Sequence, residues 1–150
     1  YSQQIIAFNK QIMLSQKYNL PIVIHWRNAF NEIINIISEY PLKSIKGVFH
    51  CFSGTVEEAE KVIELGLKIG IGGVVTYKKS GLAEVIKHIS LDNIILETDA
   101  PYITPTPFRG KRNESSYIPY IAQEIANIKG ITIQEVATIT TNNAKILFKI

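Results

Sequence analysis

The segment Asn93-Ile-Ile-Leu-Glu-Thr-Asp99 contains three consecutive large aliphatic residues and ends in an acidic residue. Short apolar, β-branched runs bounded by polar residues are typical of strands buried in a parallel sheet. A carboxylate at the end of such a strand needs a partner, because an isolated charge is costly to remove from water. The segment therefore predicts a parallel strand whose carboxyl end carries a functional group.

Three similar segments precede this strand, and helical patterns separate them. The strands are expected over residues 20–25, 45–50 and 67–72, and the helices over about 29–40, from the Thr55 capping box to Gly66, and over 81–88. A further helix begins the chain and stops at Asn19. After Asp99 we expect a long loop over 100–114, then helices over about 116–129, from Thr132 to Ile139, and over 142–148. This alternation predicts an α/β fold of parallel strands with outer helices.

Composition limits the class of protein. With 150 residues, 46% of them hydrophobic, the chain is long and apolar enough for one domain with a sizeable core. Its net charge of +3 neither requires nor excludes a polyanionic partner. The single cysteine, Cys51, cannot form an internal disulfide, and no segment predicts a membrane span or a signal peptide. We expect a cytoplasmic protein, and the start at Tyr1, in the middle of a helical pattern, indicates a C-terminal fragment.

His25, His50 and Asp99 each stand at the end of their own predicted strand. In parallel α/β folds the carboxyl ends of the strands converge on one face, so these side chains are expected to meet. Imidazole and carboxylate groups are common ligands of divalent metals, and the three residues predict a metal centre. The alternative is that each histidine is a hydrogen-bonded structural residue. His88 lies on a helix and is interpreted in that way.

Cys51 directly follows His50, and adjacent strand residues point to opposite faces. We therefore expect Cys51 to pack outward as a small apolar residue. Glu97 lies two residues before Asp99, on the same side of the strand, and is interpreted as a supporting group that hydrogen-bonds to a metal ligand from behind. The alternative for Glu97 is a pairing with a lysine.

Basic residues follow several of the predicted strands, where a substrate would arrive. A guanidinium group can donate two parallel hydrogen bonds to two oxygens of one phosphate, so these residues favour a phosphate-bearing substrate. Aromatic residues among them are candidates for stacking on bases. The alternative is a solvated, charged loop whose aromatic residues are packing anchors. The basic residues are Arg27, Lys78, Lys79, Arg109, Lys111 and Arg112, and the aromatic residues are Tyr77, Tyr102 and Phe108.

Five motifs together resemble the TatD family of metal-dependent deoxyribonucleases and related hydrolases. They are residues 20–25, 49–54, 96–102, 108–114 and 141–148, and they cover almost the whole chain. The resemblance implies a (β/α)8 TIM-type barrel of the metal-dependent hydrolase type, of which residues 1–150 form the C-terminal half. It also implies a centre with two divalent metal ions (Mg, Mn or Zn), in which His25, His50 and Asp99 match the metal-binding residues of the family.

Part of the family's ligand set has no counterpart here. The His-x-His pair of the first strand and the bridging glutamate of the fourth are absent, since the chain has only three histidines and none has that spacing. Three ligands would therefore lie outside this chain. We expect the isolated 150 residues to be inactive.

The function implied for the full-length protein is hydrolysis of DNA phosphodiester bonds, from a 3′ end, by a water activated between two metals. His25 and His50 would hold one metal, and Asp99 would bind the other and act as the catalytic group that orients or deprotonates the water. The substrate would be bound by Arg27, Arg109, Arg112 and Asn113. The alternatives are a hydrolase of a small phosphoester or amide, and a non-catalytic fragment that binds DNA weakly. Exposed sheet edges would allow such a fragment to self-associate.

Overall fold

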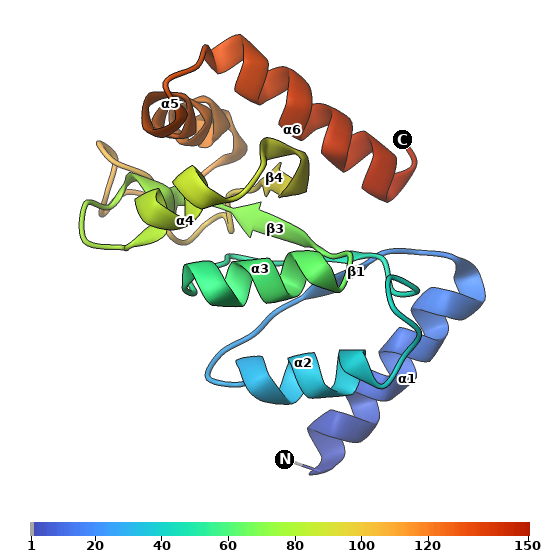
Figure 1. Cartoon of the computed structure of the whole chain (residues 1–150). Coiled ribbons are helices and arrows are strands. Elements are labelled where there is room, and N and C mark those ends of the chain that lie inside the picture. Colours follow the sequence, from blue (N-terminus) through green and yellow to red (C-terminus); the bar gives the residue numbers. More distant parts are fainter. Residues whose placement is uncertain (1) are drawn as a thin grey trace.

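The computed structural model describes residues 2–150, and a four-stranded parallel sheet organises them (Figure 1). The strands are β1 (Ile22–Ile24), β2 (Gly47–Phe49), β3 (Lys68–Ile71) and β4 (Ile94–Leu96). They pair in sequence order, β1-β2-β3-β4, and every pair is parallel. This order confirms the predicted α/β fold and is the arrangement of part of a (β/α) barrel.

Helices connect and cover the strands. Their bounds are α1 (Ser2–Tyr18), α2 (Phe30–Ser38), α3 (Val56–Glu64), α4 (Leu82–His88), α5 (Ile118–Lys129) and α6 (Ile133–Phe148). Short 3-10 turns occur at η1 (Gly73–Thr76), η2 (Leu91–Asn93) and η3 (Ser115–Tyr117). Both predicted capping boxes are present, Thr55 with Glu58 at α3 and Thr132 with Glu135 at α6.

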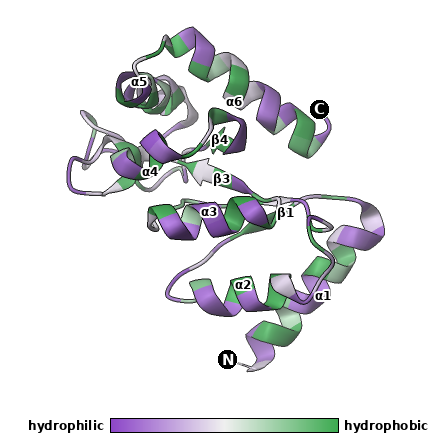
Figure 2. Cartoon of the chain, in the orientation of Figure 1, coloured by the Kyte–Doolittle hydropathy of each residue, from purple (hydrophilic) through white to green (hydrophobic). Residues whose placement is uncertain are grey.

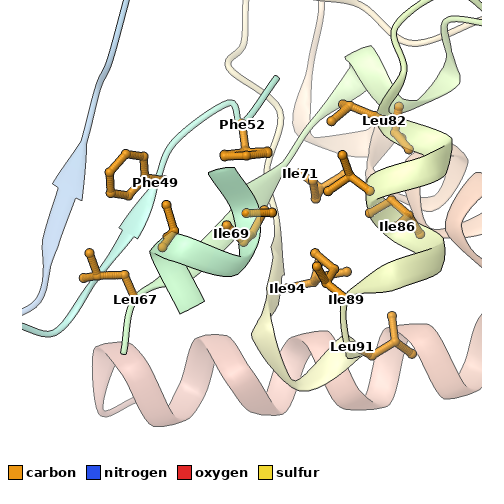
Figure 3. Close-up of a cluster of buried hydrophobic side chains, with 14 of the residues drawn as sticks. Phe49, Phe52, Leu67, Ile69, Ile71, Leu82, Ile86, Ile89, Leu91 and Ile94 are labelled. Carbon is orange, nitrogen blue, oxygen red and sulfur yellow. The ribbon is translucent and has the colours of Figure 1, made fainter. Parts of the chain in front are cut away.

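The main core lies between the sheet and the helices that pack on it (Figure 3). Phe49, Ile69 and Ile94 of three neighbouring strands are fully buried there, and so is Ile86 of α4. Burial of each such side chain contributes about 1.5–3 kcal/mol. Helices α2 and α3 carry hydrophobic and hydrophilic residues on different sides, which fits one face on the core and one in solvent (Figure 2).

The C-terminal helical region differs from its prediction. We expected two helices, from Thr132 to Ile139 and over 142–148, whereas α6 runs without a break. The Thr140 hydroxyl donates to the Val136 carbonyl at 2.8 Å within the helix. Asn143 is buried, and its amide donates to the carbonyl oxygens of Leu91 and Ile94 at 2.7 and 2.8 Å. The tertiary contacts of Asn143 outweigh the modest helix propensity of the β-branched and amide residues in this stretch.

The strands are shorter than predicted, so the candidate site lies in the loops after the strands and not on the strands themselves. The strands that precede the candidate site residues end at Ile24, Phe49 and Leu96. Within residues 2–150, none of the helices is both long enough and apolar enough to cross a lipid bilayer.

Candidate metal centre

His50, Glu97 and Asp99 form a contiguous polar cluster at the carboxyl ends of β2 and β4. His50 Nδ1 lies 2.7 Å from Glu97 Oε2, and His50 Nε2 lies 3.1 Å from Asp99 Oδ1. The backbone N–H of Cys51 donates to the other Glu97 oxygen. The Nδ1 contact with Glu97 fixes the imidazole so that Nε2 faces Asp99, which is the orientation that a metal-binding histidine needs.

The cluster spans the width of β3, because β2 and β4 are both neighbours of that strand. The Glu97 carboxylate crosses β3 at Gly70, where an added Cβ would lie 2.8 Å from Glu97 Oε1. The missing side chain at Gly70 therefore leaves the space through which Glu97 reaches His50. Glycines in strands commonly mark such close approaches.

The electrostatics of His50 follow from this arrangement. Burial lowers the pKa of His50, but hydrogen bonds and charge interactions with Glu97 and Asp99 outweigh it, so the pKa is raised above its usual value. The same two carboxylates would favour a divalent cation at this position. Glu97 pairs with a histidine and not with a lysine, which fits the predicted supporting role.

Cys51 corrects one prediction. We expected its side chain on the outer face of the strand, but β2 ends at Phe49 and Cys51 has a positive φ of 47°, so strand alternation no longer applies. Its Sγ lies within 4.8 Å of possible ligand atoms of His50 and Glu97. Burial, followed by the charges of Glu97 and Asp99, raises the pKa of the Cys51 thiol far above neutral. A protonated thiol is a weak ligand and a poor nucleophile.

His25 lies beside this cluster. It follows β1, is exposed, and its ring centroid lies 6.0 Å from that of His50. The structure thus brings all three predicted ligands to one rim, with His50 and Asp99 in contact and His25 next to them. Two imidazoles and a carboxylate are a donor set that fits a divalent metal such as Zn or Mn. The individual ligand assignments stay predictions.

Asp99 is held in an uncommon backbone conformation, with a φ of 54°. Residues other than glycine rarely adopt it, and the cost is about 1–3 kcal/mol. The Asp99 carbonyl accepts from the N–H of Tyr102 at 2.8 Å, which closes a tight turn directly after Asp99. Strained residues of this kind cluster at functional sites, where the surroundings over-determine them.

Asn113 corrects a second prediction, that of a substrate-binding residue. Its side chain is 2% exposed, and its Nδ2 donates to the carbonyl oxygens of Thr98, Tyr102 and Ile103 at 2.6, 2.6 and 3.2 Å. Its Oδ1 accepts from the N–H of Glu114 at 2.9 Å. Since these donors and the acceptor are used within the chain, Asn113 positions the loop around Asp99 and does not face a substrate.

The predicted basic and aromatic residues differ in how they are held. Arg27 and Arg112 are exposed, and Arg109 lies with its guanidinium 4.2 Å from the centre of the Tyr77 ring. Phe108 stacks on Tyr117 with ring centroids 4.4 Å apart, so it is a packing anchor. Tyr102 is 69% exposed and is the aromatic side chain most available to a ligand among the three predicted.

Sequence reasoning missed the positioning groups. The support from Gly70 and the Tyr77–Arg109 stack join segments distant in sequence, and no local pattern indicates them. The glycines of the predicted third strand, Gly70 and Gly72, were the available signal, because glycine in a strand indicates a close approach of another part of the chain without saying which.

Comparison with known proteins agrees with this geometry. The family model described as "TatD related DNase" matches residues 1–149. The uncharacterized metal-dependent hydrolase YabD of Bacillus subtilis is 44% identical over 145 residues, which cover 96% of this chain and 57% of that protein. The 3′-5′ ssDNA/RNA exonuclease TatD of Erwinia amylovora is 38% identical over 153 residues, which cover 97% of this chain and 59% of that protein.

A solved structure shows the same fold. The crystal structure of YjjV, a TatD homologue from Escherichia coli K12, superposes with a TM-score of 0.92 at 29% identity and covers 100% of this chain and 58% of that one. The chain thus spans rather more than half the length of the relatives it matches. By sequence and by fold, it belongs to the TatD related DNase family.

Proposed function

We propose that this chain contributes His25, His50 and Asp99 to the centre of a metal-dependent hydrolase that cleaves phosphodiester bonds of single-stranded DNA from a 3′ end. The observation that carries the proposal is the His50–Glu97–Asp99 cluster, in which a carboxylate orients an imidazole toward a second carboxylate. The substrate is supported by the Erwinia amylovora relative, which is named a 3′-5′ ssDNA/RNA exonuclease, and the reaction class by the Bacillus subtilis relative, which is named a metal-dependent hydrolase.

The residues of this chain would divide the work. His25 and His50 would each offer a ring nitrogen and Asp99 a carboxylate oxygen to a divalent metal, with Glu97 holding the His50 ring in place. A bound metal would lower the pKa of a water and stabilise the negative charge that develops at phosphorus. Asp99 would orient that water or accept its proton. Arg27 and Arg112 are exposed, and each would donate two parallel hydrogen bonds to phosphate oxygens.

The proposal extends to residues outside this chain. The resemblance to the family implies that a His-x-His pair and a glutamate complete the site, and the relatives are longer than this chain. We therefore expect the isolated 150 residues to be inactive, and the full-length protein to cut. An amide substrate is disfavoured, since the neighbouring surface is basic.

The test compares the full-length protein with its Asp99→Ala variant, measuring bound metal and cleavage of a 3′-overhang oligonucleotide. Asp92→Asn is the matched control, because Asp92 lies in η2 at the opposite end of β4. We expect about two metals and cutting in the wild type and the control, and a folded but inactive Asp99→Ala variant. If the wild type neither binds metal nor cuts DNA, the proposal is wrong and the cluster has only a structural role.

A second proposal concerns the isolated chain, which we expect to self-associate through its sheet edges. β1 and β4 each pair on one side only, and Val23 on β1 is 58% exposed. Unpaired strand edges favour pairing with another copy. Light scattering should give a mass above the 16.9 kDa of one chain, and Val23→Lys should return it toward that value. A monomeric wild type would contradict this proposal.

A further inference from the structure

Two loops near the candidate centre are joined into one rigid unit, here called the basic arm and defined as residues 73–81 and 100–113. The Tyr77 hydroxyl donates to the Thr104 carbonyl at 2.7 Å. The backbone N–H of Thr106 donates to the Thr76 hydroxyl at 2.8 Å. In Figure 1 the two segments lie side by side near α4, one in green and the other in yellow and orange.

The packing between the segments is close. A side chain at Gly73 would overlap the Ile103 carbonyl oxygen, so the backbones touch there without an intervening side chain. Thr104 is buried and donates its hydroxyl to the Lys111 carbonyl at 2.5 Å. A loop without regular structure is thus fixed by buried anchors along its length. Its exposed side chains start from a preorganised backbone, which lowers the entropy cost of binding.

The charge of the arm is of one sign. It carries Lys78, Lys79, Arg109, Lys111 and Arg112 and contains no acidic residue. Since the whole chain has a net charge of +3, the remainder of the chain carries a net −2. The net positive charge of this protein is therefore concentrated in the arm. Arg109 and Lys111 lie over the rings of Tyr77 and Phe108. The other three cations, Lys78, Lys79 and Arg112, have neither an ion pair nor an aromatic ring beside them within residues 2–150. Such a concentration attracts a polyanion.

The arm also offers an aromatic face. Tyr102 is 69% exposed, and both its backbone groups are fixed, the N–H by the Asp99 carbonyl and the carbonyl by the Asn113 amide. A planar side chain on a fixed backbone can stack on an unpaired base, whereas a base inside a duplex is not accessible to it. The combination of cations with an exposed ring is that of single-strand binding surfaces.

From these observations we infer that the basic arm is a strand-binding surface that holds phosphates of single-stranded DNA beyond the scissile bond, with Tyr102 stacking on a base. The inference rests on the proposed function for its substrate class, and it adds a binding surface separate from the metal ligands. The inference predicts that affinity rises with strand length, because a longer strand can reach more of the cations of the arm.

The experiment measures binding in EDTA, so that neither metal nor cleavage is needed. Fluorescence anisotropy of a labelled 12-nucleotide oligothymidylate reports the Kd for the full-length protein at several salt concentrations. Replacing Lys78, Lys79 and Lys111 by Gln removes up to three ionic contacts. We expect Kd to rise roughly 100-fold at 0.1 M salt. A plot of the logarithm of the association constant against the logarithm of the salt concentration should become less steep, by about 2 in its slope.

The matched control replaces three exposed lysines on α1 and α6, namely Lys10, Lys17 and Lys145, by Gln. It makes the same change in net charge, and we expect a slope close to that of the wild type. Equal effects of the two triple variants would overturn the inference, because binding would then follow net charge alone. So would equal affinities for the 12-nucleotide strand and for a dinucleotide.

Tyr102→Ala gives an independent readout. Stacking is not ionic, so this variant should weaken binding about 5- to 150-fold and leave the salt slope unchanged. An unchanged affinity would show that Tyr102 takes no part in strand binding. The proposed function and this inference can fail separately. If only the proposed function is wrong, the full-length protein cuts no DNA but its binding still depends on the arm. If only the inference is wrong, the protein cuts DNA but the arm substitutions do not change binding.

Discussion

Replacing Asn113 by Asp should destabilise the chain far more than an ordinary surface substitution does. The two side chains have nearly the same shape, but Asp lacks the Nδ2 group that donates to the Thr98, Tyr102 and Ile103 carbonyls. The two amide hydrogens make the two short contacts and share the third, and each full hydrogen bond contributes a net of about 1 kcal/mol, so their loss lowers the free energy of unfolding by about 2 kcal/mol. A carboxyl group facing buried carbonyl oxygens adds to this loss.

Urea unfolding followed by circular dichroism measures this difference. Asn127→Asp is the matched control, because Asn127 is exposed on α5 and its substitution should change stability by no more than about 0.5 kcal/mol. The predicted alternative role, substrate contact by Asn113, makes a different forecast: affinity for DNA would fall and stability would not. Equal unfolding midpoints for the two variants would therefore refute the positioning role.

Three further predictions test the site and the fold. Glu97→Gln removes the charge behind His50, so metal affinity should fall about 10- to 100-fold by calorimetric titration of the full-length protein; unchanged affinity would exclude a supporting role. Gly73→Ala should cost about 2–3 kcal/mol in chemical unfolding because its Cβ has no space, whereas Gly81→Ala meets no neighbour and should cost only about 1 kcal/mol for its φ of 77°. Hydrogen bonds with Thr132 in the capping box lower the pKa of Glu135. The ionised Glu135 should therefore stabilise the fold fully above pH 4.5, and this stabilisation should be lost as the pH falls through the lowered pKa. Chemical unfolding at several pH values should show this loss in the wild type and not in Glu135→Gln.

Much of the fold could be predicted from local patterns. The β-branched runs indicated all four strands, and the Thr55 and Thr132 capping boxes marked two helix starts, because each signal is complete within a few residues. The break predicted within α6 was wrong for the opposite reason. Asn143 is satisfied by carbonyl oxygens of Leu91 and Ile94, about fifty residues earlier, which no local window contains.

The candidate site divides in the same way. The meeting of its three candidate ligands was predictable, since His25, His50 and Asp99 follow strands that end on one side of a parallel sheet. The role of Asn113 was not, because its partners are backbone carbonyls whose positions depend on the turn after Asp99. The position of Cys51 depended on where β2 ends, and strand ends are poorly determined by apolar runs.

The loop after β4 joins the two halves of the proposed function. It holds Asp99 of the centre at one end and the cations of the basic arm at the other, and the Asn113 amide fixes the backbone between them. Changes at different points should therefore have separable effects. Glu97→Gln should weaken metal binding without altering the salt slope for a strand, and the lysine substitutions should do the reverse. Asn113→Asp should impair both, because one set of hydrogen bonds positions the segment after Asp99 and the arm together.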